Sequence, residues 1–359
     1  MATRRRSWFW LVLAAGLLVI GAWLMVGAEP PPRPPPPVIK LPKYMTDDEE
    51  TRAQQRETFV PLPAVDAGAV PLATPPPRPR DPLFAMMPAT VKRGAVVAEV
   101  SAILNSELGG LAFDCVTAGG RSDLDHMRDA GFDPMVHLDR VALIDGVAVI
   151  TGQFAHAPMP RGTVADYGLR AKVYDLGDSR STAVWNQQVM LSGPDDEVRA
   201  MLDRLERGDP TATSVLDPSE AYGEVYGTLA PSAIADLLGD EEPRLKELIL
   251  QTTKGVSLHV DVSHDVGVVA DVAPTDGTKT DELRRSIGSL LSLARLRAQS
   301  QGRTGQADLL ELARVRSGGG SGFRVEAGAP HEMVKSMLQR CVERRNRRAA
   351  ERAGDDAGL

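Results

Sequence analysis

The strongest constraint on this chain is a run of 22 uncharged residues near its N-terminus, Ser7 to Ala28. At a rise of 1.5 Å per residue, a helix of this length crosses a hydrocarbon core of roughly 30 Å. Trp8 and Trp23 lie near the two ends of the run, where indole rings favour the membrane interface. Three arginines at positions 4–6 favour a cytoplasmic N-terminus. We therefore expect residues 1–28 to be a cytoplasmic stub followed by a transmembrane signal-anchor.

A cleaved signal peptide is the alternative, because Val26-Gly27-Ala28 resembles a small-residue cleavage site. The apolar core of a signal peptide is usually about 7–15 residues, which is shorter than this run. We expect a single-pass protein of a bacterial inner membrane with a periplasmic domain. Cleavage after Ala28 would instead give a secreted protein.

Residues 29–90 contain 17 of the 27 prolines, including tracts at 30–37 and 75–82. Proline fixes φ and removes a donor, so neither helix nor sheet propagates through such tracts. About 60 residues of polyproline II could reach on the order of 190 Å. We expect a disordered tether that holds the folded part well clear of the membrane. Within it, Lys43–Phe59 could form a short charged helix.

The remaining composition is that of a globular protein, with 25% charged and 43% apolar residues. The net charge of −7 argues against nucleic acid as the main partner, because phosphate binding needs a concentrated basic surface. A basic cluster lies near the C-terminus. It comprises Arg344, Arg345, Arg347, Arg348 and Arg352. It is typical of a solvated helix end, with anionic lipid or nucleic acid as alternative contacts.

From Val91 onward the sequence alternates between strand and helix patterns. Leu138–Phe154 predicts two strands joined at Asp145-Gly146, a strong hairpin signal. Within Gly193–Arg207, four apolar residues repeat at i, i+3, i+4 and i+7 and predict a helix with one buried face. These are Val198, Met201, Leu202 and Leu205. Further strands or helices are expected at 95–102, 169–191, 221–230, 231–238, 255–272, 281–299 and 321–328. We therefore expect an α+β fold with antiparallel sheets covered by helices.

The helix pattern at 193–207 recurs without a gap at 329–343, a shift of 136 residues. The order strand, short helix, hairpin, strand and closing helix also recurs, with shifts of 125 for the first strand and about 119 for the hairpin. We expect two related halves, 91–210 and 211–345, each closed by a helix that packs on a sheet. Residues 346–359 would form a polar tail.

One segment, HVDVSHD, offers four possible metal ligands in seven residues. They are His259, Asp261, His264 and Asp265. Imidazole and carboxylate suit zinc or another divalent ion, whereas the alternative is an ordinary exposed hairpin. The sequence has no G-x-S-x-G, H-E-x-x-H or C-x-x-C motif, and we expect no cofactor and no catalytic residue.

Two cysteines, Cys115 and Cys341, are the complete set in the chain. In an exported domain an even pair makes a disulfide possible. The alternative is a buried free thiol, because Cys341 falls on the apolar stripe of the last helix.

The segment GFDPMVHLDRV (131–141) resembles one found in uncharacterised exported proteins of GC-rich Gram-negative bacteria. Those proteins are similar in placing two related α+β halves behind a secretion signal. The resemblance implies this layout and no functional residue.

These observations favour a membrane-anchored periplasmic protein that binds or scaffolds an envelope protein or cell-wall partner, without catalysis. A TonB-like energy transducer shares the order of anchor, proline-rich spacer and C-terminal α+β domain. A periplasmic hydrolase or metal-dependent enzyme would depend on the HVDVSHD segment.

Overall fold

The computed structural model describes residues 40–56, 81–117, 133–155, 157, 159, 163–207, 213–237, 243–275, 277–318 and 322–356. The predicted transmembrane run, Ser7–Ala28, lies outside these ranges. Within them, no helix combines the length and the apolar content needed to cross a bilayer.

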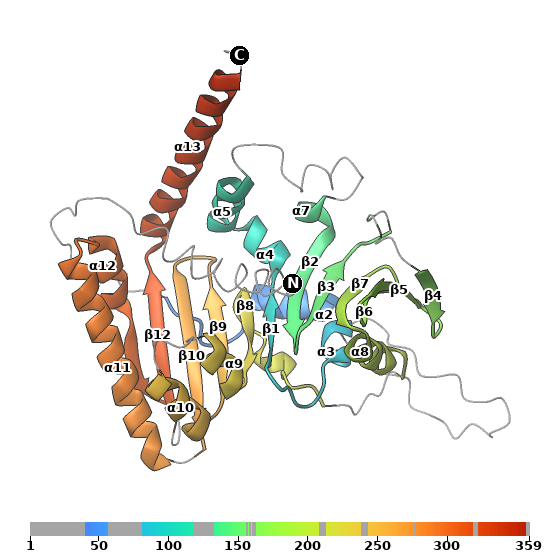
Figure 1. The fold of residues 1–359 in the computed structure, drawn as a ribbon, viewed down its shortest axis with the longest axis horizontal. Coiled ribbons are helices and arrows are strands. Elements are labelled where there is room, and N and C mark those ends of the chain that lie inside the picture. Colours follow the sequence, from blue (N-terminus) through green and yellow to red (C-terminus); the bar gives the residue numbers. More distant parts are fainter. Residues whose placement is uncertain are drawn as a thin grey trace.

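The described residues form one twelve-stranded antiparallel sheet with helices packed against it (Figure 1). The strand order is β11-β12-β10-β9-β8-β1-β2-β3-β7-β6-β5-β4. The strands are β1 (Gly94–Ala98), β2 (Leu138–Ile144), β3 (Val147–Gly152), β4 (Thr163–Tyr167), β5 (Ala171–Gly177), β6 (Arg180–Trp185), β7 (Val189–Pro194), β8 (Val225–Leu229), β9 (Thr253–Asp261), β10 (Val266–Pro274), β11 (Arg314–Ser317) and β12 (Phe323–Ala329). The helices are α2 (Asp47–Arg56), α3 (Pro82–Met86), α4 (Val100–Asn105), α5 (Glu107–Thr117), α7 (Pro134–His137), α8 (Asp195–Arg207), α9 (Pro231–Leu237), α10 (Pro243–Thr252), α11 (Gly277–Ser300), α12 (Thr304–Leu312) and α13 (His331–Asp356), with a short 3-10 helix at Pro218–Glu220. The expected α+β class is confirmed, and the structure has one continuous antiparallel sheet where separate antiparallel sheets were expected.

The strand order reads alike in both directions from the central β1–β8 pair. On one side lie β1, β2, β3 and β7, and on the other lie β8, β9, β10 and β12. In each series a strand and a short helix precede a hairpin, and a fourth strand pairs with the second strand of the hairpin. The insertion before the fourth strand differs, since it holds β4–β6 in the first series and α11, α12 and β11 in the second.

The predicted hairpin at Asp145-Gly146 is confirmed. Both residues have positive φ, 48° and 94°, as a tight turn between twisted strands requires. The Asp145 carboxylate also accepts the backbone N–H groups of Lys92, Arg93 and Gly94 at 2.9, 2.7 and 3.1 Å. The turn therefore fixes the start of β1 as well as joining β2 to β3.

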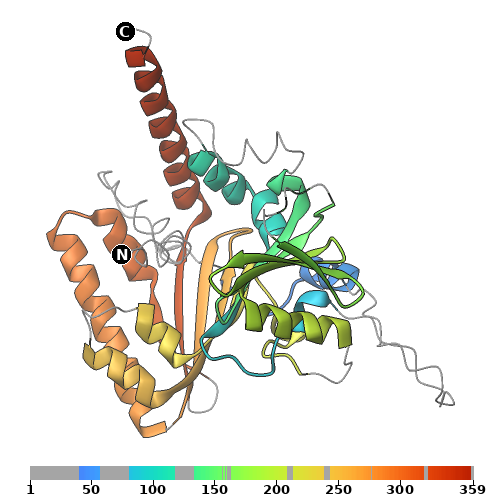
Figure 2. The same ribbon diagram turned by 45° about the vertical axis from the view of Figure 1, so that its right-hand side comes forward.

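The first core lies between α8, α3 and the strands that curve around α8 (Figure 2). The predicted stripe of α8 is confirmed, with Val198, Met201, Leu202 and Leu205 at most 2% exposed. Burial of side chains of this size contributes roughly 1.5–3 kcal/mol each. The helix begins at Asp195, because β7 extends to Pro194.

A second core packs α10 and α11 on the opposite face of the sheet. Tyr226 and His259 lie in one row with Val97 of the first core. Val256, three residues before His259, points to the other face and packs with Leu283 of α11. Along β8–β10, α10 and α11 therefore leave uncovered the face of the sheet that continues the first core. Residues 40–56 cover this face.

The expected tether, residues 29–90, is wrong for two of its segments. Residues 40–56 and 81–90 belong to the folded body, and Leu83, Met86 and Met87 are core residues at most 2% exposed. The prolines did not prevent this, because Pro82 occupies the first turn of α3, where a missing N–H costs nothing. The short charged helix expected within Lys43–Phe59 is confirmed as α2.

The last helix also differs from the expectation. It does not lie on the sheet as α8 does, since Val334 and Leu338 pack mainly with Leu108 and Leu111 of α5 and with Ala329. It continues as a helix to Asp356, where a polar tail was expected from residue 346. Its distal part projects from the body (Figure 1).

Candidate functional site: the charged cluster that binds the N-terminal strap

Residues Lys40–Arg56, here called the strap, run across the middle of the sheet. The strap starts at the β9–β10 turn, where the Lys40 N–H donates to Asp265 at 3.2 Å. At Gly267 of β10 a Cβ atom would lie 2.9 Å from the Lys40 carbonyl oxygen and 3.1 Å from Pro42. Glycine therefore permits close approach of the strap to the strand.

A capping box starts the helix of the strap. Thr46 precedes α2, and its backbone N–H donates to Glu49 Oε2 at 2.6 Å, while the Glu49 N–H approaches Thr46 Oγ1 at 3.4 Å. The other oxygen of Glu49 accepts the backbone N–H of Gly223 at 2.6 Å. One carboxylate thus fixes the helix start and binds it to the segment before β8.

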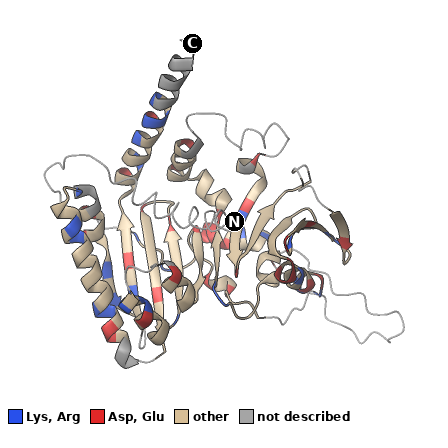
Figure 3. Cartoon of the chain, viewed as in Figure 1, with Lys and Arg blue, Asp and Glu red and all other residues tan. Residues whose placement is uncertain are grey.

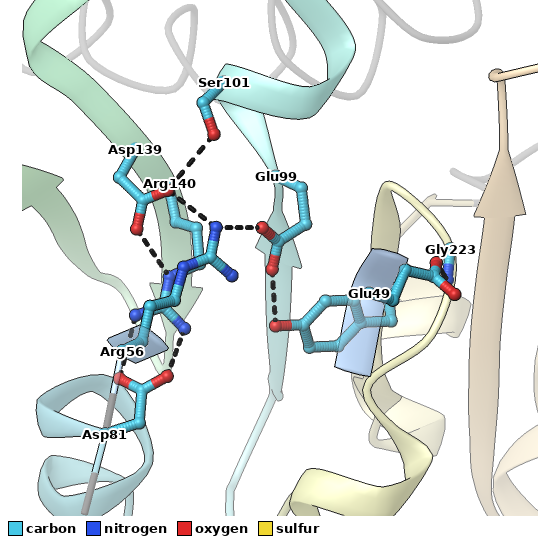
Figure 4. A network of polar contacts seen from close by, with 9 residues as sticks. Glu49, Arg56, Asp81, Glu99, Ser101, Asp139, Arg140 and Gly223 are labelled. Carbon is cyan, nitrogen blue, oxygen red and sulfur yellow. Dashed lines mark hydrogen bonds and ion pairs between the residues drawn. The ribbon is translucent and has the colours of Figure 1, made fainter. Parts of the chain in front are cut away.

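The strap ends at Arg56, which enters a cluster of charged side chains (Figure 4). Its guanidinium lies 2.7 Å from Glu99, at the end of β1, and 2.6 Å from Asp139, in β2. Glu99 has a side chain 5% exposed and Arg56 15%. Ser101 donates to Asp139 at 3.1 Å. We call the set Arg56, Asp81, Glu99, Asp139 and Arg140 the charged cluster.

A buried bidentate pair completes this cluster. Arg140 donates to both oxygens of Asp81 at 2.5 and 2.8 Å, and the two side chains are 3% and 9% exposed. Asp81 also accepts the Leu83 N–H at 2.9 Å and so caps α3. Arg56 and Asp81, the described residues on either side of positions 57–80, therefore both lie in the charged cluster.

The charges of the cluster stabilise one another. Burial alone lowers the pKa of Arg140, but the Asp81 carboxylate more than offsets this and raises the pKa above the usual value for arginine. Burial and the nearby Arg140 lower the pKa of Arg56, whereas Glu99 and Asp139 raise it, with a net rise. Burial raises the pKa of Tyr226, so its phenol stays protonated and donates to Glu99 at 3.0 Å.

The cluster is built to hold chain segments together. Each carboxylate already faces a guanidinium: Glu99 and Asp139 face Arg56, and Asp81 faces Arg140. Further donors to these carboxylates are the Tyr226 and Ser101 hydroxyls and the Leu83 N–H.

Glu224 lies beside the strap and carries a displaced pKa. Burial, with Asp261 and Glu49 nearby, raises its pKa to about 7. The carboxylate is 5% exposed and accepts the Val262 N–H at 2.8 Å. Glu224 therefore titrates near neutral pH at the point where the strap crosses β8.

The proposed metal ligands do not converge. His259 is buried, stacks on Tyr222 at a centroid distance of 3.7 Å, and has its pKa lowered by burial. Asp261 accepts the Ser263 N–H within the turn, and His264 is exposed. Asp265 accepts the N–H groups of Lys40 and His331. In the part of the chain that the structure describes, no three His, Cys, Asp or Glu residues gather as a metal site.

The structure joins Cys115 of α5 to Cys341 of α13 in a disulfide, with the Cα atoms 5.5 Å apart. Glu107 of α5 adds an ion pair with Lys335 at 2.5 Å and a hydrogen bond with His331 Nε2 at 3.0 Å. The base of α13 is therefore fixed to α5, and the free-thiol alternative does not describe this structure.

A cavity of about 310 Å³ lies between α11, α12 and β11. Arg284, Arg285 and Arg295 line it. Arg284 pairs with Asp281 at 3.2 Å and Arg295 with Glu311 at 3.0 Å, so acidic neighbours already offset much of its charge.

Sequence reasoning did not identify the charged cluster. The signal was present in the strand period, because Arg140 alternates with Ala142 and Ile144 and so points inward. A charged residue at an inward position predicts a buried partner. The identity of that partner, Asp81, had no signal, since it is 59 residues away within the expected tether.

Comparisons with known proteins add little to this description. No protein-family model matches the chain, and no curated protein matches it. A solved structure described as "Structure of crystal form I of TP0453" is similar at 11% sequence identity and a TM-score of 0.36, over 72% of this chain and 96% of that chain. A likeness at this level carries no conclusion about fold or function.

Proposed function

We propose that this chain is a single-pass, membrane-anchored envelope protein that binds or scaffolds a partner without catalysing a reaction. The body would comprise two related halves, in keeping with the matching strand orders on either side of the β1–β8 pair. An envelope protein or cell-wall material is the expected partner, reached from the periplasmic side of the membrane.

The attachment of the strap carries this proposal. Between the end of the apolar run at Ala28 and the first bound residue, Lys40, there are eleven residues. A chain of that length spans at most about 40 Å in any conformation. The body would therefore remain close to the membrane, rather than on the order of 190 Å away.

The same geometry weakens the two alternatives. A TonB-like transducer relies on a long spacer, and the strap takes the middle of that spacer into the body. The metal-enzyme alternative depended on His259, Asp261, His264 and Asp265, which have separate structural contacts.

Two measurements on cells test the proposal. The first is extraction of membranes with alkaline carbonate, which we expect to leave the chain in the membrane fraction. The second is crosslinking in intact cells, compared with a variant in which a cleavable signal peptide replaces residues 1–28. We expect an envelope protein or cell-wall fragment to crosslink to the anchored chain and much less to the released one. Release of the native chain by carbonate, or recovery of no envelope component, would contradict the proposal.

A further inference from the structure

The distal part of α13 is the most basic surface on the described helices that is not packed on the body. Residues 340–348 carry five arginines and one glutamate in a chain whose net charge is −7. Cys341 is 7% exposed, whereas Glu343, Arg345 and Arg347 are exposed. The two ribbon views show this part of the helix leaving the body, and Figure 3 shows the basic residues along it.

A helix that is polar on all sides gains no stability from an apolar face. Beyond Cys341, α13 continues for fifteen residues, to Asp356. The disulfide and the ion pair between Glu107 and Lys335 hold its base against α5. A rigid base with an exposed basic end is suited to presenting charge at a distance from the body.

The membrane-side end of the strap lies at the base of the same helix. One carboxylate, that of Asp265, accepts the Lys40 N–H at 3.2 Å and the His331 N–H, the first of α13, at 3.0 Å. The first residue of the strap and the first residue of α13 therefore lie at the same point on the body.

Their lengths also correspond. The eleven residues that precede Lys40, seven of them proline, reach about 34 Å in a polyproline II conformation. Along α13, Arg344 to Arg348 lie roughly 20–26 Å from His331. A membrane surface at the end of this linker is within reach of these arginines. Lys40, Lys43 and Tyr44 are exposed at the same end of the strap, Tyr44 to 75%, and suit the same interface.

We propose that the distal part of α13 binds anionic phospholipid headgroups beside the membrane anchor and so sets the orientation of the body on the membrane. This inference rests on the proposed function, because it requires the anchor. An arginine near an anionic surface contributes a factor of about five to binding, and the effect is screened by salt.

The test uses the full chain in vesicles of phosphatidylglycerol or of phosphatidylcholine, with an acceptor dye on the lipid. The donor is a fluorophore on a single added cysteine, Ala349→Cys, since Cys115 and Cys341 are joined to each other. We expect strong energy transfer in phosphatidylglycerol and weak transfer in phosphatidylcholine or at about 0.5 M salt. Reversal of four charges, Arg344→Glu, Arg345→Glu, Arg347→Glu and Arg348→Glu, should lower the ratio of quenched to unquenched donor at least tenfold.

The matched control reverses four exposed basic residues elsewhere, Arg170→Glu, Lys172→Glu, Arg244→Glu and Arg303→Glu. It changes the net charge equally and should leave the transfer unchanged. Equal energy transfer in the two lipids, or equal loss of transfer in both variants, would overturn the inference about α13. If the chain still remains in the membrane after carbonate washing, the proposed membrane anchor stands. Loss of the native chain from the vesicles on washing would overturn both. Arginine-dependent crosslinking to a protein without lipid-dependent transfer would assign the helix to an acidic protein partner instead.

Discussion

Replacing Arg56 by methionine tests whether the charged cluster holds the strap on the body. Methionine keeps an unbranched apolar stem but removes the ion pairs to Glu99 at 2.7 Å and to Asp139 at 2.6 Å. Hydrogen bonds to charged groups contribute about 1.5–3 kcal/mol each, and partial exposure of Asp139, at 32%, weakens the second pair. We expect the free energy of strap opening to fall by about 3 kcal/mol, which corresponds to a roughly hundredfold rise in the open population.

Hydrogen–deuterium exchange resolved by peptide measures this opening directly. Amides of α2 should exchange about a hundredfold faster in the Arg56→Met variant, while those of α8, in the first core, should keep their rates. Arg52→Met is the matched control on the same helix, because Arg52 forms no ion pair with the described part of the body. Adding Glu99→Gln to Arg56→Met should recover part of the protection, since a neutral amide at this position needs no cation.

Two results would refute this reasoning. An increase of less than about threefold in the exchange of α2 would mean that the ion pairs do not hold the strap. An equal increase in α2 and α8 would mean that Arg56 supports the whole fold rather than the attachment of one segment.

Three further predictions concern stability. Arg140→Leu leaves the buried Asp81 carboxylate without its cation and should cost about 3–5 kcal/mol in urea unfolding, with a smaller cost when Asp81→Asn is added; a loss below about 1 kcal/mol would contradict a buried pair. Burial, with Asp261 and Glu49 nearby, raises the pKa of Glu224 from 4.5 to about 7, so the folded state binds the extra proton and wild-type stability should fall as pH rises through this window, by at most about 3 kcal/mol. Burial lowers the pKa of His259, so protonation of His259 reduces stability as pH falls below the usual pKa of histidine. The comparison is therefore with Glu224→Gln, which keeps His259. Parallel pH profiles of stability for the two proteins would contradict the assignment to Glu224. Cys341→Ser removes a cross-link between residues 226 positions apart and should cost about 3–5 kcal/mol, an effect that reductant should reproduce in the native chain; an unfolding midpoint insensitive to reductant would mean that the cysteines are not joined in solution.

Local patterns predicted many of the elements of the body. The stripe of α8, the turn at Asp145-Gly146 and the helix that starts at Pro231 each depend on a few neighbouring residues, and all three are confirmed. The expected strand at 95–102 ends at Ala98, because residues 100–105 form α4. The short helices α10 and α12 and the strands β4 and β11 were not predicted, and they depend on tertiary contacts more than on a regular period.

The charged cluster could not be predicted in the same way. Its members come from the strap, from the segment before α3, and from β1 and β2, so a tertiary arrangement creates it. Proline content was a misleading guide here, since it describes how a segment folds alone. The run from Leu83 to Met87 carries enough apolar surface to bind a core that already exists, and Glu49 and Arg56 supply specific contacts for an otherwise polar helix.

Strand register relates the two series of strands independently of sequence similarity. In the first half Ala148 of β3 lies opposite Ser192 of β7, and in the second half Gly267 of β10 lies opposite Gly328 of β12. The two shifts found in the sequence relate these pairs: the hairpin shift of 119 takes Ala148 to Gly267, and the shift of 136 takes Ser192 to Gly328. The shift of 125 fails, because it would move β1 to residues 219–223, before β8 begins at Val225. The outer strands therefore match in register, whereas the sequence alignment of β1 with β8 was wrong. The closing helices have separate roles, since α8 completes a core and α13 leaves the body beside the start of the strap.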